Sequence, residues 1–342
     1  HRPIPSTLTG FPRIEATTRD QPRRLPLISN LHICTDWCRL GPSGRKKPRR
    51  CDNTSGPCLA SAFDSDEYMP AIKILPNGGT VSIDHTPGSH ERAKRGSTQG
   101  WTPRASRGNR DFLWSVRAPE LTHTGYAVTL TIRTCPESSQ DWQRLRRAWV
   151  ERLRRAGMVR LHWVTEWQRR RVPHLHAAVW LPDGLDHRYI IGHWLSVALP
   201  YGCSERAQDV RKLTGATGWF EYLAKHAARS VSNYQRSPDS MPEGWEKTGR
   251  VWGYSGDWPR DEQTDVTLND AGFYRYRRLW MAYAIAKARA KGDFYRVRYL
   301  RNYLQSSDRS VSSQRAFSEW ASRDVQLAMI AAVATRPDVE VS

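Results

Sequence analysis

Residues 160–181, RLHWVTEWQRRRVPHLHAAVWL, hold the two segments that decide the fold. Apolar residues recur in both segments, and the polar run QRRR between them is typical of a turn. The sequence therefore predicts two antiparallel strands that turn near Arg170. In that register Glu166 lies opposite His174, and Val164 lies opposite His176.

The predicted hairpin brings a carboxylate and two imidazoles onto one face of a sheet. Cross-strand partners share a face, as do residues two apart on a strand, so Glu166, His174 and His176 converge. A slip of one residue would separate the glutamate from the histidines. Two imidazoles and a carboxylate suit a divalent metal with open positions; the alternative is a set of strand histidines with satisfied hydrogen bonds. The opposite face carries the expected core residues Trp163, Thr165, Trp167, Leu175, Ala177 and Val179.

The flanking segments predict an α+β domain. GYAVTLTIR (125–133) alternates like a strand with one buried face, and residues 138–157 form an amphipathic helix pattern that starts at serine caps and stops at Gly157. Residues 185–199 and 215–234 are two more expected helices. The order strand, helix, strand, strand, helix favours helices packed on an antiparallel sheet.

The composition indicates a polyanionic partner. The 342 residues include 53 Lys and Arg against 34 Asp and Glu, a formal net charge of +19. Nucleic acid is the leading candidate. No stretch approaches the roughly 18 consecutive apolar residues of a membrane helix, so we expect a soluble, cytoplasmic protein.

Composition also divides the chain into three expected regions. Residues 1–110 are basic and loop-rich, 111–260 carry the patterned α+β domain, and 261–342 are basic and helical. The first region has four cysteines that could hold a structural zinc ion, although their spacing departs from the usual motif and free thiols are the alternative. These cysteines are Cys34, Cys38, Cys51 and Cys58.

Three motifs in order resemble those of the HUH endonuclease superfamily, specifically the rolling-circle replication initiators of bacterial plasmids and filamentous phages. PHLHAAVW (173–180) is similar to the His-hydrophobic-His motif, YAVTLTIR (126–133) to the first motif, and GWFEYLAKHAAR (218–229) to the third. GRVWGYSGDW (249–258) also resembles a stretch of phage-type initiators. The resemblance covers about residues 120–255 and neither flank.

The resemblance implies a fold, a metal site and a nucleophile. The fold would be an antiparallel-sheet HUH nuclease domain, derived from the RRM or ferredoxin-like fold, with helices on one face. Mg²⁺ or Mn²⁺ would be held by Glu166, His174 and His176. Tyr222 would be the nucleophile, and Lys225 at i+3 would favour its phenolate. Whether His226 or Tyr234 takes part is left open.

The implied function is initiation of rolling-circle replication. The protein would nick single-stranded DNA at an origin, stay linked through a 5′-phosphotyrosine, leave a 3′-hydroxyl primer and later rejoin strands. The chain has no G-x-x-x-x-G-K-[ST] run for ATP, so a host helicase and polymerase are the expected partners. A related transposase or relaxase and a non-catalytic nucleic-acid-binding protein are the alternatives.

Basic side chains outside the motifs are candidates for phosphate contact. The alternative for them is a solvated surface. The candidates are Arg169, Arg170, Arg171, Arg277, Arg278, Arg296 and Arg298.

Overall fold

The computed structural model describes residues 68–85, 100–227, 231, 233–305 and 317–341. The chain separates into two compact units, residues 1–61 and 62–342, and every described residue belongs to the second. The four cysteines expected to bind zinc lie outside the described residues, so the zinc site stays a prediction.

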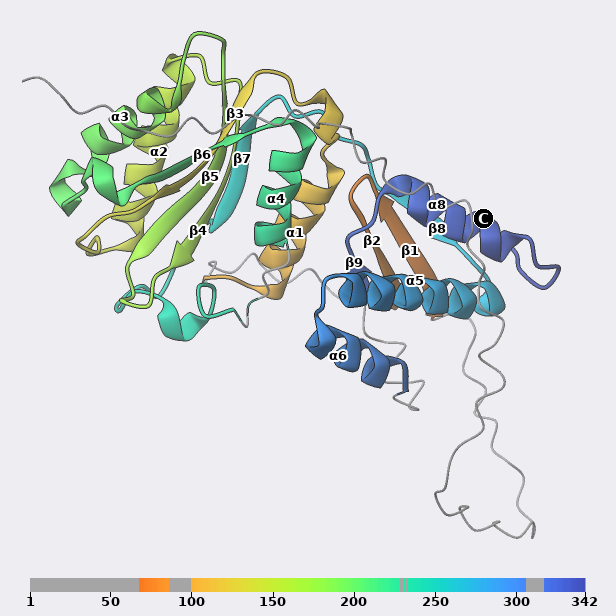
Figure 1. The fold of residues 1–342 in the computed structure, drawn as a ribbon. Coiled ribbons are helices and arrows are strands. Elements are labelled where there is room, and N and C mark those ends of the chain that lie inside the picture. The colour runs from red at the N-terminus through yellow and green to blue at the C-terminus, as the bar shows by residue number, and fades with distance from the viewer. Residues whose placement is uncertain (1–67, 86–99, 228–230, 232, 306–316, 342) are drawn as a thin grey trace, which may run out of the picture. The chain divides into compact units, whose positions relative to one another are not determined.

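A five-stranded antiparallel sheet forms the centre of the region that was predicted to be an α+β domain (Figure 1). The predicted hairpin supplies its middle, because β5 pairs with β4 on one side and β3 on the other. Its strands, in spatial order, are β6 (Asp209–Leu213), β3 (Thr124–Leu130), β5 (Pro173–Leu181), β4 (Arg160–Trp167) and β7 (Trp252–Gly256).

The predicted register of the hairpin is confirmed. Glu166 pairs with His174, and Val164 pairs with His176. The chain reverses through residues 168–172, where the Gln168 amide donates to the Val172 carbonyl at 3.0 Å and Arg171 takes a positive φ of 57°. All residues of β4 and β5 are buried, which a central position in the sheet requires.

Helices cover both faces of this sheet. Helix α2 (Ser139–Arg155) starts at the predicted serine cap, where the Ser138 side chain accepts from the Asp141 amide, and it packs with α3 (His187–Ala198) on one face. Helices α1 (Pro103–Ser115) and α4 (Gly215–Ala227) lie on the other face (Figure 1). The antiparallel α+β sheet is therefore confirmed, whereas the expectation of helices on one face is wrong. The reason is that the second face also carries apolar residues, Ala178 and Trp180, and α1 and α4 bury them.

A second antiparallel sheet joins segments from the two flanks. Strands β1 (Tyr68–Leu75) and β2 (Gly78–His85) form a hairpin, β1 pairs with β8 (Thr264–Thr267), and β2 pairs with β9 (Phe317–Glu319). Its core includes Ile72 and Ile74 of the sheet and Phe273 and Trp280 of α5 (Asp270–Ala290). The remaining elements are α6 (Phe294–Gln305), α8 (Arg323–Ala334) and 3-10 turns at Ala118–Glu120, Leu199–Tyr201, Glu205–Ala207 and Pro238–Ser240.

The second sheet gives the N-terminal flank more regular structure than the sequence predicted. Residues 1–110 were expected to be loop-rich, but residues 68–85 form two strands and α1 begins at Pro103. Asn77, in the turn between those strands, donates from Nδ2 to the carbonyls of Trp114 at 3.1 Å and Val116 at 2.6 Å. The second sheet is thus hydrogen-bonded to the C-terminal end of α1, one of the helices that cover the five-stranded sheet.

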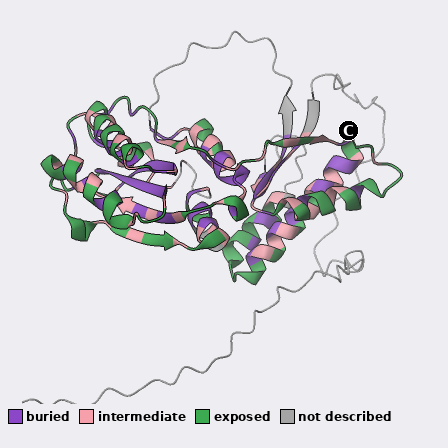
Figure 2. Ribbon diagram, turned by 90° about the horizontal axis from the view of Figure 1, so that it is seen from above, coloured by how far each residue is buried: buried purple, intermediate pink, exposed green. Residues whose placement is uncertain are grey.

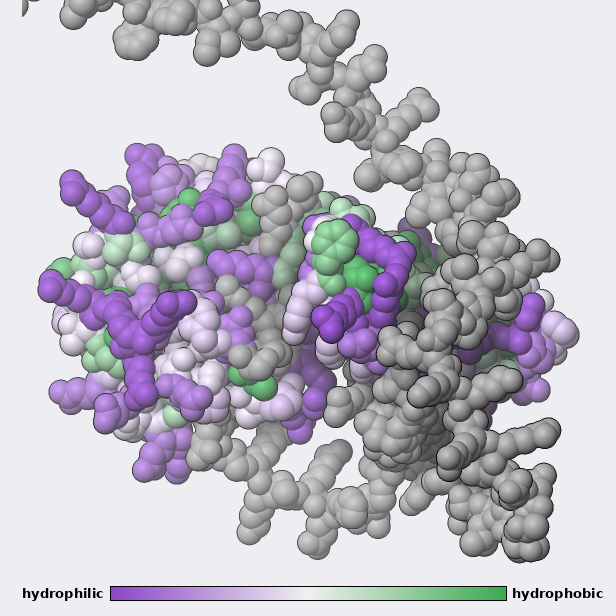
Figure 3. Space-filling view, turned by 60° about the horizontal axis from the view of Figure 1, so that its bottom comes forward, coloured by the Kyte–Doolittle hydropathy of each residue, from purple (hydrophilic) through white to green (hydrophobic). Residues whose placement is uncertain are grey.

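Burial follows this architecture. In Figure 2 the buried residues concentrate in the strands and on the inner faces of the helices. The face shown in Figure 3 is mostly hydrophilic, with only small groups of hydrophobic side chains among the described residues. No helix in the described part of the chain has the length and apolar character needed to cross a membrane.

Candidate active site

The three predicted metal ligands come together on the face of the five-stranded sheet that α1 and α4 cover. Glu166 is completely buried, and His174 and His176 are each 5% exposed. One candidate ligand atom from each side chain lies within 4.8 Å of the others. Glu166 Oε2 is 3.4 Å from His176 Nε2, and the two imidazole rings have centroids 4.4 Å apart.

Neighbouring side chains fix the orientation of these ligands. Thr129 on β3 lies opposite His176 in the sheet, and its Oγ1 is 3.0 Å from His176 Nδ1. That contact occupies Nδ1 and leaves Nε2 facing the carboxylate. Hydrogen bonds to the second ring nitrogen are the usual device that orients a metal-binding histidine.

Arg236 neutralises the buried glutamate from the other side. Its Nε donates to Glu166 Oε1 at 2.9 Å, and both side chains are completely buried. The guanidinium lies 3.9 Å from the centre of the Trp101 ring and also donates to the His226 carbonyl at 3.1 Å. A buried carboxylate needs such a partner. Oε1 is therefore committed to Arg236, while Oε2 faces His176.

The donor set fits a divalent cation. Imidazole nitrogens and a carboxylate oxygen bind Mn²⁺, Fe²⁺ or Zn²⁺ well, and sites of this composition leave coordination positions for other ligands. The 3.4 Å between Oε2 and Nε2 is the kind of separation that two ligands take around one ion of this size. Glu166, His174 and His176 could therefore hold a metal as they stand.

Tyr222 reaches the same face from helix α4. Its hydroxyl is 2.9 Å from His162 Nδ1, and the side chain is 5% exposed. The His226 ring lies between the tyrosine and the ligand group, with its centroid 4.5 Å from that of Tyr222 and 5.0 Å from that of His176. The structure thus places the predicted nucleophile beside the predicted metal ligands.

His162 and Asn109 form a hydrogen-bonded chain behind Tyr222. His162 Nε2 is 2.8 Å from Asn109 Oδ1, and both residues are fully buried. Because an amide oxygen can only accept, Nε2 carries the proton, Nδ1 is the acceptor, and the tyrosine hydroxyl donates to it. The assignment depends on the orientation of the Asn109 amide, whose Nδ2 in turn donates to the His226 carbonyl at 3.4 Å.

Burial keeps both members of the tyrosine–histidine pair neutral. It lowers the pKa of His162 to about 3, with a smaller effect from the charge of Arg236. It also raises the pKa of Tyr222 well above its ordinary value; the Glu166 charge adds to this rise and Arg236 opposes it. Without metal and substrate, Tyr222 therefore stays a phenol at physiological pH.

The other predicted residues lie farther from this centre. Lys225 is on the exposed side of α4, and Arg236 is a cation that lowers the pKa of Tyr222. Tyr234 is 49% exposed, and its ring lies 5.4 Å from the Arg169 guanidinium. His226, left open by the sequence, is buried between Tyr222 and His176.

The candidate phosphate-binding arginines divide into two groups. Arg170 donates to the carbonyls of Ile132 and Arg133, which follow β3, so its guanidinium supports the turn. Arg169, Arg171 and Arg278 are exposed, and Arg277 lies 5.6 Å from the Tyr303 ring. Contact between these residues and DNA stays a prediction.

Three site residues were missed by the sequence interpretation. His162 had a signal, because it precedes Glu166 by four positions on one strand and therefore shares its face. Asn109 and Arg236 had none, since they arrive from a helix and a loop that lie 53 and 70 residues away in sequence from their partners.

Comparisons with known proteins place the chain among replication proteins. The family of the replication-associated protein ORF2 matches residues 125–230, which run from β3 past α4. A putative replication protein of Xylella fastidiosa strain 9a5c is 46% identical over 276 residues, covering 78% of this chain and 98% of that protein. The chain belongs to the ORF2 family of replication-associated proteins.

Further relatives of this ORF2-family protein extend the similarity to a phage. A replication-associated protein of Pseudomonas phage Pf3 is 40% identical over 268 residues, covering 77% of this chain and 96% of the phage protein. A second putative replication protein, from Xylella fastidiosa strain Temecula1, is 47% identical over 262 residues and is covered completely. No solved structure matches the chain.

Proposed function

We propose that this ORF2-family protein initiates rolling-circle replication by nicking one DNA strand, with Tyr222 as the nucleophile. The observation that carries the proposal is the position of the Tyr222 hydroxyl. It is hydrogen-bonded to His162 on the sheet face that also carries Glu166, His174 and His176. Family membership supports a role in replication, and the geometry supports this chemistry for it.

In the proposed reaction Tyr222 Oη forms a bond to the scissile phosphorus while the bond from phosphorus to the 3′ oxygen breaks. The phenolic proton passes to His162 Nδ1, and the departing 3′ oxygen takes a proton from solvent. The products are a 5′-phosphotyrosine and a 3′-hydroxyl that a polymerase can extend. Rejoining runs the same steps backwards, and His162 returns its proton to Tyr222.

Burial keeps Tyr222 protonated and unreactive in the free protein, and binding of metal and DNA would favour loss of its proton. A divalent metal held by Glu166, His174 and His176 would neutralise charge on the scissile phosphate and align it. The phosphate would bring negative charge to the site, which favours a protonated His162. Asn109 would keep the imidazole in the tautomer that accepts the proton.

The proposed partners follow from the chemistry. The substrate would be an unpaired stretch of origin DNA in the cytoplasm of a bacterial host, and a host helicase and polymerase would act after the nick. The proposed domain limits are those of the sequence analysis, except that residues 68–85, 264–267 and 317–319 contribute strands to a shared second sheet.

A denaturing gel tests the proposal. Protein is incubated with 3′-labelled single-stranded origin DNA in Mn²⁺ or in EDTA, and the label is followed into a protein adduct. We expect a metal-dependent adduct for the wild type and for Tyr234→Phe, and none for Tyr222→Phe. DNA binding without an adduct under all conditions would favour a non-catalytic DNA-binding protein instead.

A further inference from the structure

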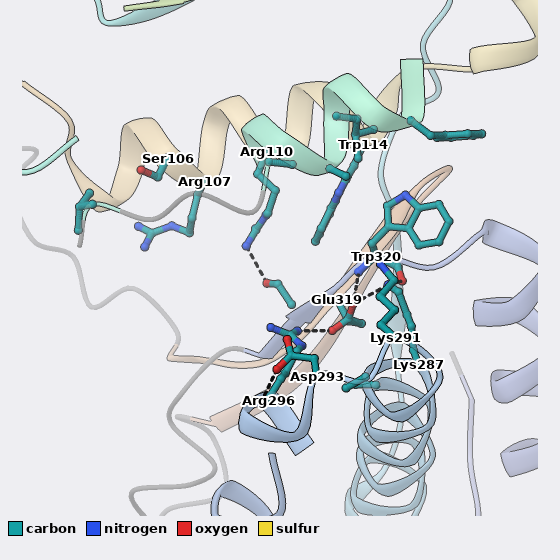
Figure 4. A pocket seen from close by; sticks show the side chains of 18 of the residues that line it. Ser106, Arg107, Arg110, Trp114, Lys287, Lys291, Asp293, Arg296, Glu319 and Trp320 are labelled. Carbon is teal, nitrogen blue, oxygen red and sulfur yellow. Dashed lines mark hydrogen bonds and ion pairs between the residues drawn. The ribbon is translucent and has the colours of Figure 1, made fainter. Parts of the chain in front are cut away.

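A cleft of about 800 Å³ lies outside the candidate active site (Figure 4). Helices α1 and α4 form one side, and α5, the start of α6 and strand β9 form the other. Helix α4 presents Phe220, Ala224 and Ala227 to the cleft. These positions lie on the opposite side of the helix from Tyr222, which packs against the sheet.

The lining of the cleft is strongly basic. Two acidic side chains, Asp293 and Glu319, face five basic ones. Glu319 is bound by Lys287 at 2.7 Å and by Arg296 at 2.5 Å, and Arg110 is paired with Asp111 at 2.7 Å. The structure shows no acidic partner for Arg107 or Lys291 among the described residues. The basic residues are Arg107, Arg110, Lys287, Lys291 and Arg296.

The same lining holds buried polar atoms without hydrogen-bond partners in the described part of the chain. They are the indole nitrogens of Trp114 and Trp320 and the hydroxyl of Ser106. The Trp114 side chain is 5% exposed. Each of these atoms is closed off from the cleft, so the groups that a ligand can reach there are the more exposed basic and aromatic side chains, such as Arg107, Lys291 and Trp320.

Aromatic rings give the cleft a second property. Trp114, Phe220 and Trp320 all line it, with Arg110 4.8 Å from the centre of the Trp114 ring and Lys287 4.5 Å from that of Trp320. Positive charge beside aromatic rings is the combination by which proteins bind unpaired nucleic acid, because cations contact the phosphates and rings stack on the bases.

We propose that this cleft binds a segment of single-stranded DNA away from the scissile phosphate. Arg107 and Lys291 contact its phosphates, one from each side of the cleft, and Trp320 contacts a base. The inference rests on the proposed function and deepens it by adding a second point of contact with the cut strand. Helix α4 then carries the nucleophile on one face and a strand-binding surface on the other.

Fluorescence anisotropy with a labelled single-stranded oligonucleotide tests the cleft directly. All variants are made in the Tyr222→Phe background and measured in EDTA, so that no cutting interferes. The test pair is Arg107→Ala with Lys291→Ala. The control pair is Arg147→Ala with Arg155→Ala, two exposed arginines of α2 on the other face of the five-stranded sheet. Both pairs lower the net charge equally.

We expect the test pair to weaken binding and to reduce the magnitude of the slope of log K against log salt by about 1.4, since each lost phosphate contact on a single strand contributes about 0.7. The control pair should leave the slope unchanged. Trp320 should also cross-link to a photoreactive thymidine in the bound strand. Equal slopes for the two pairs, or a loss confined to duplex DNA, would overturn the proposal.

The two proposals fail separately. If wild-type protein forms no covalent adduct while the cleft variants still lose affinity, the nicking chemistry is wrong and the binding site stands. If the adduct forms normally and the cleft variants bind as the control pair does, the cleft is not a DNA site.

Discussion

At the scale of single residues, the hydrogen-bonded chain from Asn109 through His162 to Tyr222 carries the proposed chemistry. The amide fixes the histidine tautomer, and the histidine fixes the direction of the tyrosine hydroxyl at 2.9 Å. The position of His162 on β4 could have been predicted, because period two puts residues 162 and 166 on one face. The contributions of Asn109 and Arg236 depend on tertiary packing that no local pattern encodes.

Replacing His162 should slow the reaction without weakening DNA binding. We expect His162→Gln to lower the single-turnover rate of adduct formation by about a hundredfold to ten-thousandfold, the usual contribution of a general base. Asn109→Ala should lower this rate less, because it removes only the hydrogen bond that fixes the tautomer of His162. Rapid-quench kinetics at saturating DNA measure the rate, and anisotropy measures binding. An unchanged rate for His162→Gln would contradict the assigned role.

The buried histidine should also make folding sensitive to acid. The pKa of His162 is lowered to about 3 in the folded state, so the unfolded chain binds a proton that the native protein does not. Its contribution to stability is complete above pH 6.5 and declines as pH falls toward 3. Between pH 6.5 and 5, protonation of His162 in the unfolded chain should lower the free energy of unfolding by about 2 kcal/mol.

Urea unfolding at pH 7.5 and pH 5 measures this loss. In His162→Gln, which has no titrating group at this position, the difference between the two pH values should be smaller than in the wild type. Equal differences would mean that His162 is charged, or solvated, in the native state.

At the scale of elements, the register of the β4–β5 hairpin could be predicted because a slip of one residue would separate Glu166 from His174 and His176 and move the apolar set to the other face. The β1–β2 hairpin also had a local signal that the sequence interpretation missed. Asn77 and Gly78 stand between two apolar runs, a combination typical of tight hairpin turns. The pairing of β1 with β8 and of β2 with β9 could not be predicted, because strands so far apart in sequence leave no local trace.

The turn between β4 and β5 offers a test at this scale. Arg171 has a φ of 57°, a conformation that costs an ordinary residue roughly 1–2 kcal/mol and glycine very little. After the extra backbone entropy of glycine is subtracted, Arg171→Gly should stabilise the protein by about 0.5 kcal/mol, and Arg171→Val should destabilise it. Chemical denaturation checks both variants. A clear loss of stability in Arg171→Gly would show that the arginine side chain itself supports the turn.

At the scale of the whole molecule, the two sheets have different roles. The five-stranded sheet carries the candidate active site, and the four-stranded sheet carries one side of the basic cleft. A net charge of +19 is consistent with a protein that contacts DNA phosphates beyond the scissile one. The net charge and the grouping of Glu166, His174 and His176 could be predicted from the sequence, but the cleft could not, because residues that line it, such as Arg107 and Lys291, lie far apart in the chain.

Metal binding should stabilise the whole fold, because an ion that binds only the native state shifts the unfolding equilibrium. At a Mn²⁺ concentration a hundred times the dissociation constant, the gain should be about 2.7 kcal/mol. Thermal unfolding should therefore move upward with Mn²⁺ and return after EDTA. The shift should be lost in His174→Ala with His176→Ala and kept in His123→Ala with His187→Ala, two exposed histidines. A shift of the same size in both pairs would place the metal elsewhere.

The most direct test of the account is to locate the covalent bond. The adduct formed by wild-type protein in Mn²⁺ is trimmed with nuclease to a single nucleotide, digested with trypsin and sequenced by mass spectrometry. The account predicts a nucleotide attached through its 5′ phosphate to the peptide 213–225, in which Tyr222 is the single tyrosine. A nucleotide on Tyr234 or another residue, or one linked through its 3′ phosphate, would contradict it.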